Sequence, residues 1–463
     1  MPIRDFVTRP NALFASAMLL FTIAFIGMDI AFFFPLVVVA PLFIYWSFRR
    51  PEIWISCVIL FHAVILQRTE EITIWEVLYG IYFFGFIGFW IVDHLVARST
   101  SILREPADLF LAGFLGVSFL SGIVALASGA SMIHWFRELL TMATLLVFFP
   151  AREIFRTRKG IRFVVISFLL LTMGLAIKNI MGYGTESAAV KYYFQVVTSR
   201  QSTYTQFFAI TTVLSFSFWI HRFEEHRFSA VAFVAFMVAA AALIATFYRA
   251  FWIGTLIAIF LLFFFLDRSK RTLALFGLVG SLLLGALGLW IFAGNLGGAI
   301  VSVIGSRFLS SGSPLDDISF TNRLVESEAA IAAFLRSPIL GHGLGASIEY
   351  FSLLSKRTYE SWYIHNGYLF LLFKVGIFGT LLFFGFFGNV LVRGWKIARD
   401  QGTLHDVVHL VRGTWAALTS LLIVAVTSNV FIERESLLVI PLASAFLMSL
   451  AESPAKRPTP GVT

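Results

Sequence analysis

A histidine and an asparagine stand together where a long polar stretch of the chain gives way to an apolar one. His365-Asn366 follows the polar residues 294–364 and opens the apolar run 365–392. An imidazole exchanges protons near neutral pH, so it suits a general base that acts on a substrate held where an apolar helix meets water. The alternative interpretation is an interfacial histidine with no chemical role.

Several cations are expected at the same ends of the apolar runs. Arg249 lies between two apolar runs that almost no loop separates, and Arg323 opens a short segment with helical spacing. The guanidinium fork holds phosphate oxygens bidentately and keeps its charge. A basic pocket of this kind predicts an anionic lipid headgroup, such as a pyrophosphate. Further candidates for contact with such a substrate are Arg137, Lys178, Arg200 and Asn366.

Each cation also has a structural interpretation. Arg249 would be an interfacial anchor whose head reaches water. Arg323 would form a surface ion pair with Glu326 or Glu328. Arg137 would be neutralised between helices by Glu138, which follows it. Lys178 and Arg200 would be ordinary loop cations.

Three other polar features carry weaker signals. Lys374 lies nine residues beyond the histidine in the same apolar run and needs a partner or a wet cavity. Gly341-His-Gly-Leu-Gly345 lacks the Gly-Lys-Ser/Thr ending of a phosphate loop, and we interpret it as a turn that packs closely. Asp316-Asp317 is a poor metal site, because two adjacent carboxylates lack further ligands.

The composition indicates an integral membrane protein. Apolar residues make up 59% of the chain and charged residues 13%, against about 25% charged in soluble domains. The lone cysteine, Cys57, excludes a disulfide framework and a cysteine metal site. The net charge of +9 comes from short basic clusters between apolar runs, as in the positive-inside pattern, which argues against nucleic-acid binding.

Because a span needs about 20 apolar residues, the sequence predicts an all-α polytopic membrane protein with about fourteen transmembrane helices, twelve being the alternative. The expected spans are 12–29, 30–48, 52–67, 73–96, 106–128, 132–150, 161–181, 203–220, 228–247, 250–266, 272–293, 365–392, 411–431 and 436–452. With an even count, both termini and all basic clusters fall on one side of the membrane.

The predicted organisation has four parts. N-terminal transmembrane helices occupy 1–293, a large loop 294–364, C-terminal helices 365–452 and a disordered tail 453–463. Within the loop, the spacing of apolar side chains predicts a short amphipathic helix over 322–334, which Ser337-Pro338 ends. The apolar side chains that give this spacing are Leu324, Ile331 and Leu335.

Three motifs in order resemble those of a known group. Phe247-Tyr-Arg249 opens an apolar helix, Asn322-Arg323 precedes the Pro338-x-x-Gly-x-Gly-x-Gly segment, and His365-Asn366 is followed by nine residues, Gly376, two residues and Gly379. Together they resemble the bacterial O-antigen ligase and polysaccharide polymerase superfamily over roughly 245–380. Tyr248 departs from the serine that the family carries before its arginine.

The resemblance implies a glycosyltransferase of the bacterial inner membrane, with one large periplasmic loop and both termini cytoplasmic. Family members take a glycan from undecaprenyl pyrophosphate; ligases pass it to lipid A-core, and polymerases to another lipid-linked repeat. The resemblance implies no metal, cofactor or nucleotide sugar. His365 would be the base, and Arg249 and Arg323 would hold the pyrophosphate. We expect membrane lipids around a monomer. The complete histidine motif favours a ligase, and a polymerase of the same superfamily is the first alternative. A transporter of such lipids is the second alternative, although no internal repeat supports it.

Overall fold

The computed structural model describes residues 42–65, 73–188, 203–221, 226–281, 283–284, 302, 305–306, 318–400 and 407–452. Within these residues the regular secondary structure is helical apart from one β-hairpin. It divides into two compact units, residues 1–93 and 94–463.

The first unit contains α3 (Pro51–Ile65) and α4 (Ile74–Val92), which pack against each other. Thr73 begins α4 with a capping box, in which Thr73 and Glu76 satisfy each other's backbone N–H groups. Buried aromatic rings hold the pair together, with Trp54 stacked on Phe86 at 3.8 Å between centroids.

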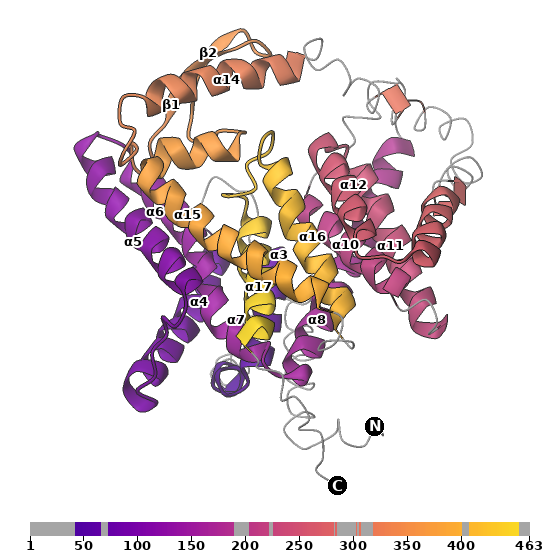
Figure 1. Cartoon of the computed structure of the whole chain (residues 1–463). Coiled ribbons are helices and arrows are strands. Elements are labelled where there is room, and N and C mark those ends of the chain that lie inside the picture. Colours follow the sequence, from indigo (N-terminus) through magenta and orange to yellow (C-terminus); the bar gives the residue numbers. More distant parts are fainter. Residues whose placement is uncertain are drawn as a thin grey trace, which may run out of the picture. The chain divides into compact units, whose positions relative to one another are not determined.

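The second unit carries the remaining helices, and Figure 1 shows their arrangement. They are α5 (Pro106–Ala127), α6 (Met132–Ala143), α7 (Phe148–Ile154), α8 (Arg158–Ala188), α10 (Thr205–His221), α11 (His226–Ala245), α12 (Arg249–Phe263), α14 (Ile318–Phe334), α15 (Gly367–Arg399), α16 (Val408–Val424) and α17 (Arg434–Glu452). The hairpin pairs β1 (Ile348–Ser352) with β2 (Arg357–Ser361).

Seven helices among the described residues are long and apolar enough to cross a membrane. They are 74–97, 106–127, 132–154, 158–186, 228–245, 367–399 and 434–451. Three shorter apolar helices, 51–63, 249–263 and 408–424, coincide with further expected spans. The chain is therefore an all-α membrane protein, while the count of fourteen spans stays a prediction. The expected span 12–29, most of 30–48 and part of 272–293 lie outside the described residues.

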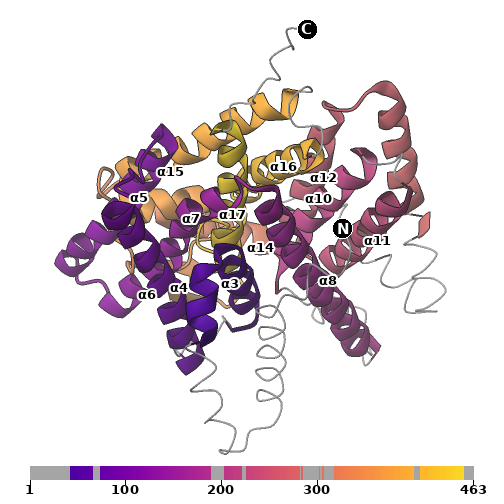
Figure 2. The ribbon, with the colours of Figure 1, turned by 90° about the horizontal axis from the view of Figure 1, so that it is seen from below.

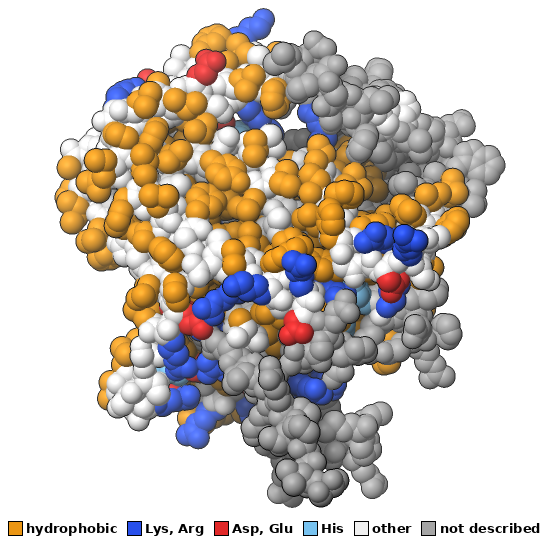
Figure 3. Space-filling view, in the orientation of Figure 1, with side chains coloured by type: hydrophobic (Ala, Val, Ile, Leu, Met, Phe, Trp, Pro, Cys, Tyr) orange, Lys and Arg blue, Asp and Glu red, His pale blue; other side chains and the backbone are white. Residues whose placement is uncertain are grey.

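Helix α15 is central to the second unit. It packs against α5, α16 and α17 (Figure 2), and α14 lies against it. Hydrophobic side chains cover the face over α5, α15 and α16, and Lys and Arg side chains gather along its border farthest from α14 (Figure 3). Two ion pairs tie α5 to its neighbours: Arg152 of α7 with the buried Asp108, and the partly exposed Arg393 of α15 with Glu105.

α15 is broken rather than continuous. Gly376 has φ 67° and ψ −174°, a conformation in which a side chain is strained. The glycine-rich segment fills the break: His342 N–H donates to Phe373 O at 2.8 Å, and Gly343 N–H donates to Lys374 O at 2.9 Å. In return, Ile377 N–H donates to the Pro338 carbonyl at 2.8 Å. These bonds satisfy backbone groups that the break leaves without helical partners.

The three glycines of this segment explain how it fits. Gly341, Gly343 and Gly345 all have positive φ, and a Cβ on each would meet the backbone of a neighbouring helix. The interpretation of this segment as a closely packed turn is confirmed. Its glycines thus let the segment pack closely against α15, α5 and α6. This packing accounts for the three glycines without a bound ligand.

The expected loop helix is present as α14, but its buried side carries polar residues and its predicted apolar side is exposed. Asn322, Glu326, Ala330 and Ala333 are its buried residues, whereas the apolar residues that predicted it are exposed. The reason is that two polar side chains find partners inside. Asn322 Oδ1 accepts from Leu353 N–H at 2.7 Å, and Glu326 binds the chain that leads into α15.

Candidate active site

The loop-side end of α15 holds a histidine–carboxylate pair. His365 Nδ1 donates to Glu326 Oε2 at 2.9 Å, and the His365 backbone N–H donates to the same oxygen at 3.1 Å. Glu326 is 1% exposed, whereas the imidazole is 38% exposed. The buried carboxylate therefore fixes the ring from behind while the ring itself reaches the surface.

This contact decides which ring nitrogen can act. A carboxylate oxygen accepts, so Nδ1 carries the proton and Nε2 has its lone pair outward. Nε2 has no hydrogen-bond partner among the described residues. The Glu326 charge also favours the imidazolium that forms when Nε2 takes a proton. The pair has the properties of a general base with an orienting carboxylate.

Helix capping fixes where this base stands. Asn366 is the N-cap of α15, and its Oδ1 accepts from Tyr368 N–H at 3.0 Å and Leu369 N–H at 3.1 Å. Gly367 N–H donates to the Ala425 carbonyl at 2.8 Å. The start of α15 is thus tied to the turn that follows α16. The Asn366 oxygen serves as a helix cap, and any substrate contact of its amide NH₂ group stays a prediction.

Arg323 lies one helical turn before Glu326 on α14. Its guanidinium donates to the Thr427 carbonyl at 2.8 Å, in the same turn after α16. Its Nε is buried and has no hydrogen-bond partner among the described residues. Glu326 pairs with His365, and the alternative of an Arg323–Glu326 ion pair is not found. Arg323 therefore keeps donor capacity beside the base.

Tyr363 links this region to the start of α12. Its ring packs edge-on against His365 at 5.1 Å between centroids, and its hydroxyl donates to Glu433 Oε1 at 3.2 Å. Burial raises the pKa of the Tyr363 phenol well above its usual range, and Glu433 and Tyr248 raise it further. Tyr248 is the N-cap of α12 and directly precedes Arg249.

The buried Lys374 has the partner that its position demands. Its Nζ donates to both carboxylate oxygens of Glu138, at 2.7 and 2.9 Å, and to the Ala346 carbonyl at 2.6 Å. Glu138 Oε2 also accepts from Gly345 N–H at 2.8 Å. This cluster joins α6, the glycine-rich segment and the break in α15 beneath the base. The Glu138 carboxylate is thus bound by Lys374, whereas the structural interpretation of Arg137 paired this carboxylate with Arg137.

The structure ties the other expected site residues less closely to the His365 site. Arg249 and Arg137 are half-buried at α12 and in α6, and Lys178 is exposed in α8. Tyr183, further along α8, contacts Phe247 next to the start of α12, at 5.7 Å between ring centroids. Arg200 and Asp316-Asp317 lie outside the described residues. Their roles stay predictions.

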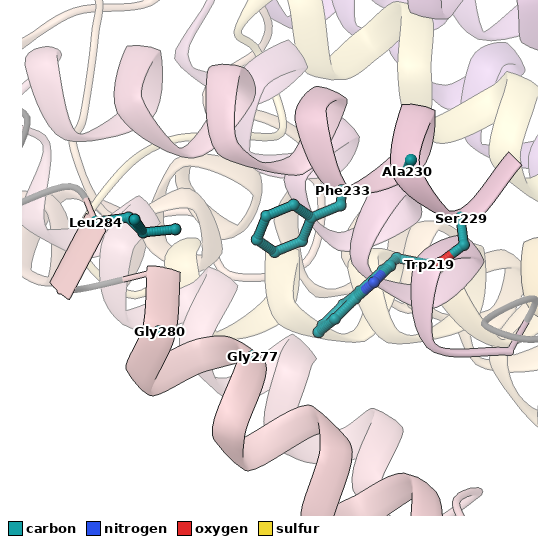
Figure 4. A pocket seen from close by; sticks show the side chains of 7 residues that line it. All are labelled: Trp219, Ser229, Ala230, Phe233, Gly277, Gly280 and Leu284. Atoms are coloured by element: carbon teal, nitrogen blue, oxygen red, sulfur yellow. The ribbon is translucent and has the colours of Figure 1, made fainter. Parts of the chain in front are cut away.

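Two cavities in the described part of the chain lie away from this site. The larger, of about 360 Å³, is apolar and lies between α10, α11 and residues 277–284; its lining residues are Trp219, Ser229, Ala230, Phe233, Gly277, Gly280 and Leu284 (Figure 4). The smaller is lined by α10, α12 and α16. Neither cavity is lined by His365 or by any other titratable side chain.

Comparison with known families agrees with the geometry. Residues 232–384 match the family model described as O-antigen ligase. This stretch is similar to an O-antigen ligase family domain. The match confirms the expected resemblance, and the domain includes Arg249, Arg323, Glu326 and His365. No curated protein matches the chain. The ligase-family domain ends within α15, so the Thr427 turn and Glu433 contribute from outside it.

Sequence reasoning missed the role of Glu326 and Glu138. From the sequence, Glu326 is expected only as a partner for Arg323, and Glu138 only as a partner for Arg137. A signal was present for Glu326, which is one turn from Arg323 in a predicted helix. That signal does not identify the histidine, which is 39 residues away.

Proposed function

We propose that this protein is a membrane glycosyltransferase that moves a glycan from undecaprenyl pyrophosphate to an acceptor hydroxyl on the periplasmic side of the inner membrane. The acceptor we favour is lipid A-core, which would make it an O-antigen ligase. The observation that carries the proposal is the His365 Nδ1–Glu326 contact at 2.9 Å within the O-antigen ligase family domain.

The reaction follows from these side chains. His365 Nε2 takes the proton of the acceptor hydroxyl while its oxygen attacks the anomeric carbon, because a sugar hydroxyl is a weak nucleophile. The bond between that carbon and the pyrophosphate oxygen breaks, and undecaprenyl pyrophosphate leaves with the electron pair. A single displacement of this kind inverts the anomeric carbon.

The leaving group gains charge as it departs, and fixed cations stabilise that change. Arg323 is suited to this role because its Nε is unpartnered among the described residues and its helix also carries Glu326. Arg249 is the second cation, supported by the closeness of Tyr248 to Tyr363. Arg137, Lys178 and Arg200 are proposed as outer contacts to the donor or acceptor.

The topology that this reaction needs is also a proposal. The α14 end would be periplasmic, and the ends with Arg393, Lys396 and Arg399 would be cytoplasmic. A cysteine placed at the exposed Glu328 should react with a membrane-impermeant maleimide from the periplasmic side. Labelling only after the inner membrane is opened would contradict this orientation.

The test of function is glycan transfer by the purified protein in lipid vesicles. Given undecaprenyl-pyrophosphate repeat units and lipid A-core, a ligase yields glycan-capped lipid A-core. A ladder of repeats on the lipid carrier, with no capped core, would make the protein a polymerase of the same superfamily. If the folded protein yields neither product but moves the lipid-linked glycan across vesicles, the transferase proposal is wrong and a transporter replaces it. Mass photometry of the same sample tests whether the active form is a monomer.

A further inference from the structure

The β-hairpin carries two tyrosines on the face that α14 contacts. Tyr350 and Tyr359 are direct cross-strand partners, so their side chains lie on the same face of the hairpin. α14 packs against β1, where Tyr350 is half-buried. Tyr359 is 49% exposed, because β2 lies at the outer side. Phe351, on the same strand as Tyr350, points to the opposite face and is exposed.

Tyr350 belongs to the neighbourhood of the base. Burial raises the pKa of its phenol, and the charge of Glu326 raises it further, so the two side chains are close. Asn322, on the same helix as Glu326, also lies beside the Tyr350 phenol. The Asn322 oxygen accepts from Leu353 N–H at 2.7 Å, directly after β1.

Helical geometry separates the hairpin from the arginine. Residues advance by about 100° around an α-helix, so Asn322 lies on one side of Glu326 and Arg323 on the other. Asn322 contacts the hairpin, whereas Arg323 contacts the Thr427 turn. The histidine–carboxylate pair thus lies between a cationic side and an aromatic, hydroxyl-bearing side.

We propose that Tyr350 and Tyr359 form a saccharide-binding subsite for the acceptor glycan, on the side of His365 away from Arg323. The inference rests on the proposed function and specifies which side of the base takes which substrate. A pyrophosphate suits the arginine side. A sugar suits the tyrosine side, since the exposed Tyr359 ring offers an apolar surface on which the C–H face of a sugar can stack.

The chain path supports the same assignment. β2 ends at Ser361 and continues directly to Tyr363 and His365, so the hairpin and the base share one short segment. Ser361 Oγ donates to the Tyr363 carbonyl at 2.6 Å, which fixes that segment. A glycan resting on Tyr359 would therefore lie beside the segment that carries His365.

The test compares Tyr359→Ala with Phe351→Ala, which removes an exposed aromatic ring from the other face of the same hairpin. Transfer kinetics in vesicles should show a rise of about five- to tenfold in the acceptor KM for Tyr359→Ala, the value of one aromatic contact. The donor KM and kcat should stay near wild type, and Tyr359→Phe and Phe351→Ala should resemble wild type. Equal effects of Tyr359→Ala and Phe351→Ala, or no effect of Tyr359→Ala, would overturn the subsite.

A binding measurement separates this proposal from the proposed function. Delipidated core oligosaccharide is titrated into full-length His365→Ala protein, with and without Tyr359→Ala, and binding is followed by saturation-transfer NMR. Weaker binding with Tyr359→Ala supports the subsite even if the wild-type protein transfers no glycan. Wild-type transfer together with unchanged oligosaccharide binding would retain the transferase and reject the subsite. Melting curves of each variant check that the hairpin remains folded.

Discussion

Replacing Glu326 by glutamine removes one negative charge behind His365 and little else. Glutamine has nearly the same shape, and its carbonyl oxygen can still accept from the His365 backbone N–H, a bond of 3.1 Å in the native protein. The ring keeps a neutral partner at Nδ1. Glu328 offers a matched control, because it is an exposed glutamate on the same helix.

The size of the effect follows from the bond that is changed. A hydrogen bond to a charged group contributes about 1.5–3 kcal/mol and a neutral one about 0.5–1.5 kcal/mol. The difference of roughly 1–2 kcal/mol applies mainly when the imidazolium forms, so it belongs to the transition state. Since about 1.4 kcal/mol is tenfold in rate, we expect Glu326→Gln to lower kcat by roughly 5- to 30-fold with little change in KM.

The assay is single-turnover glycan transfer in vesicles at saturating donor and acceptor. If Glu326 acts through His365, the double variant Glu326→Gln/His365→Ala should be no slower than His365→Ala alone. Glu328→Gln should match wild type. Wild-type rates for Glu326→Gln, or the same fold loss in the His365→Ala background, would refute the reasoning.

Three further variants test the surroundings of the base. Gly376→Ala should destabilise the protein by about 1–3 kcal/mol, because its positive φ strains a side chain; an unchanged melting temperature would contradict the proposed packing of the break. Lys374→Met should cost about 3–5 kcal/mol by leaving Glu138 without its cation, and adding Glu138→Leu should restore much of it; a melt in which the double variant is the least stable would reject this pair. Arg323→Gln should lower kcat/KM for the donor about tenfold, with Arg336→Gln, exposed just after α14, as its control; equal effects of the two would remove Arg323 from the site.

Spans of ordinary length were predictable because about 20 apolar residues specify them. The span expected at 106–128 is found at Pro106–Ala127, and that expected at 228–247 at 228–245. The span expected at 365–392 differs in two ways. α15 continues to Arg399, since its basic last turns remain helical beyond the apolar run, and it breaks at Gly376. Helical periodicity does not reveal such a break, which depends on the glycine-rich segment inserted there.

The position of His365 was predictable because an apolar run begins there, but its partner was not. Glu326 and Glu328 are two residues apart, and the rotation of α14 decides which of them is buried. That rotation depends on Asn322 meeting the hairpin, a long-range contact without a sequence period. The Lys374–Glu138 pair joins residues 236 positions apart, and spacing carries no information at that range.

The central claim is that His365 removes the acceptor proton in glycan transfer. The most direct measurement is the rate of transfer from undecaprenyl-pyrophosphate repeats to lipid A-core by wild-type and His365→Ala protein in vesicles, at matched folded concentration. The account predicts that His365→Ala lowers the rate by about 10²–10⁴-fold, the value of general base catalysis, while donor binding persists. Transfer by folded His365→Ala at the wild-type rate would contradict it.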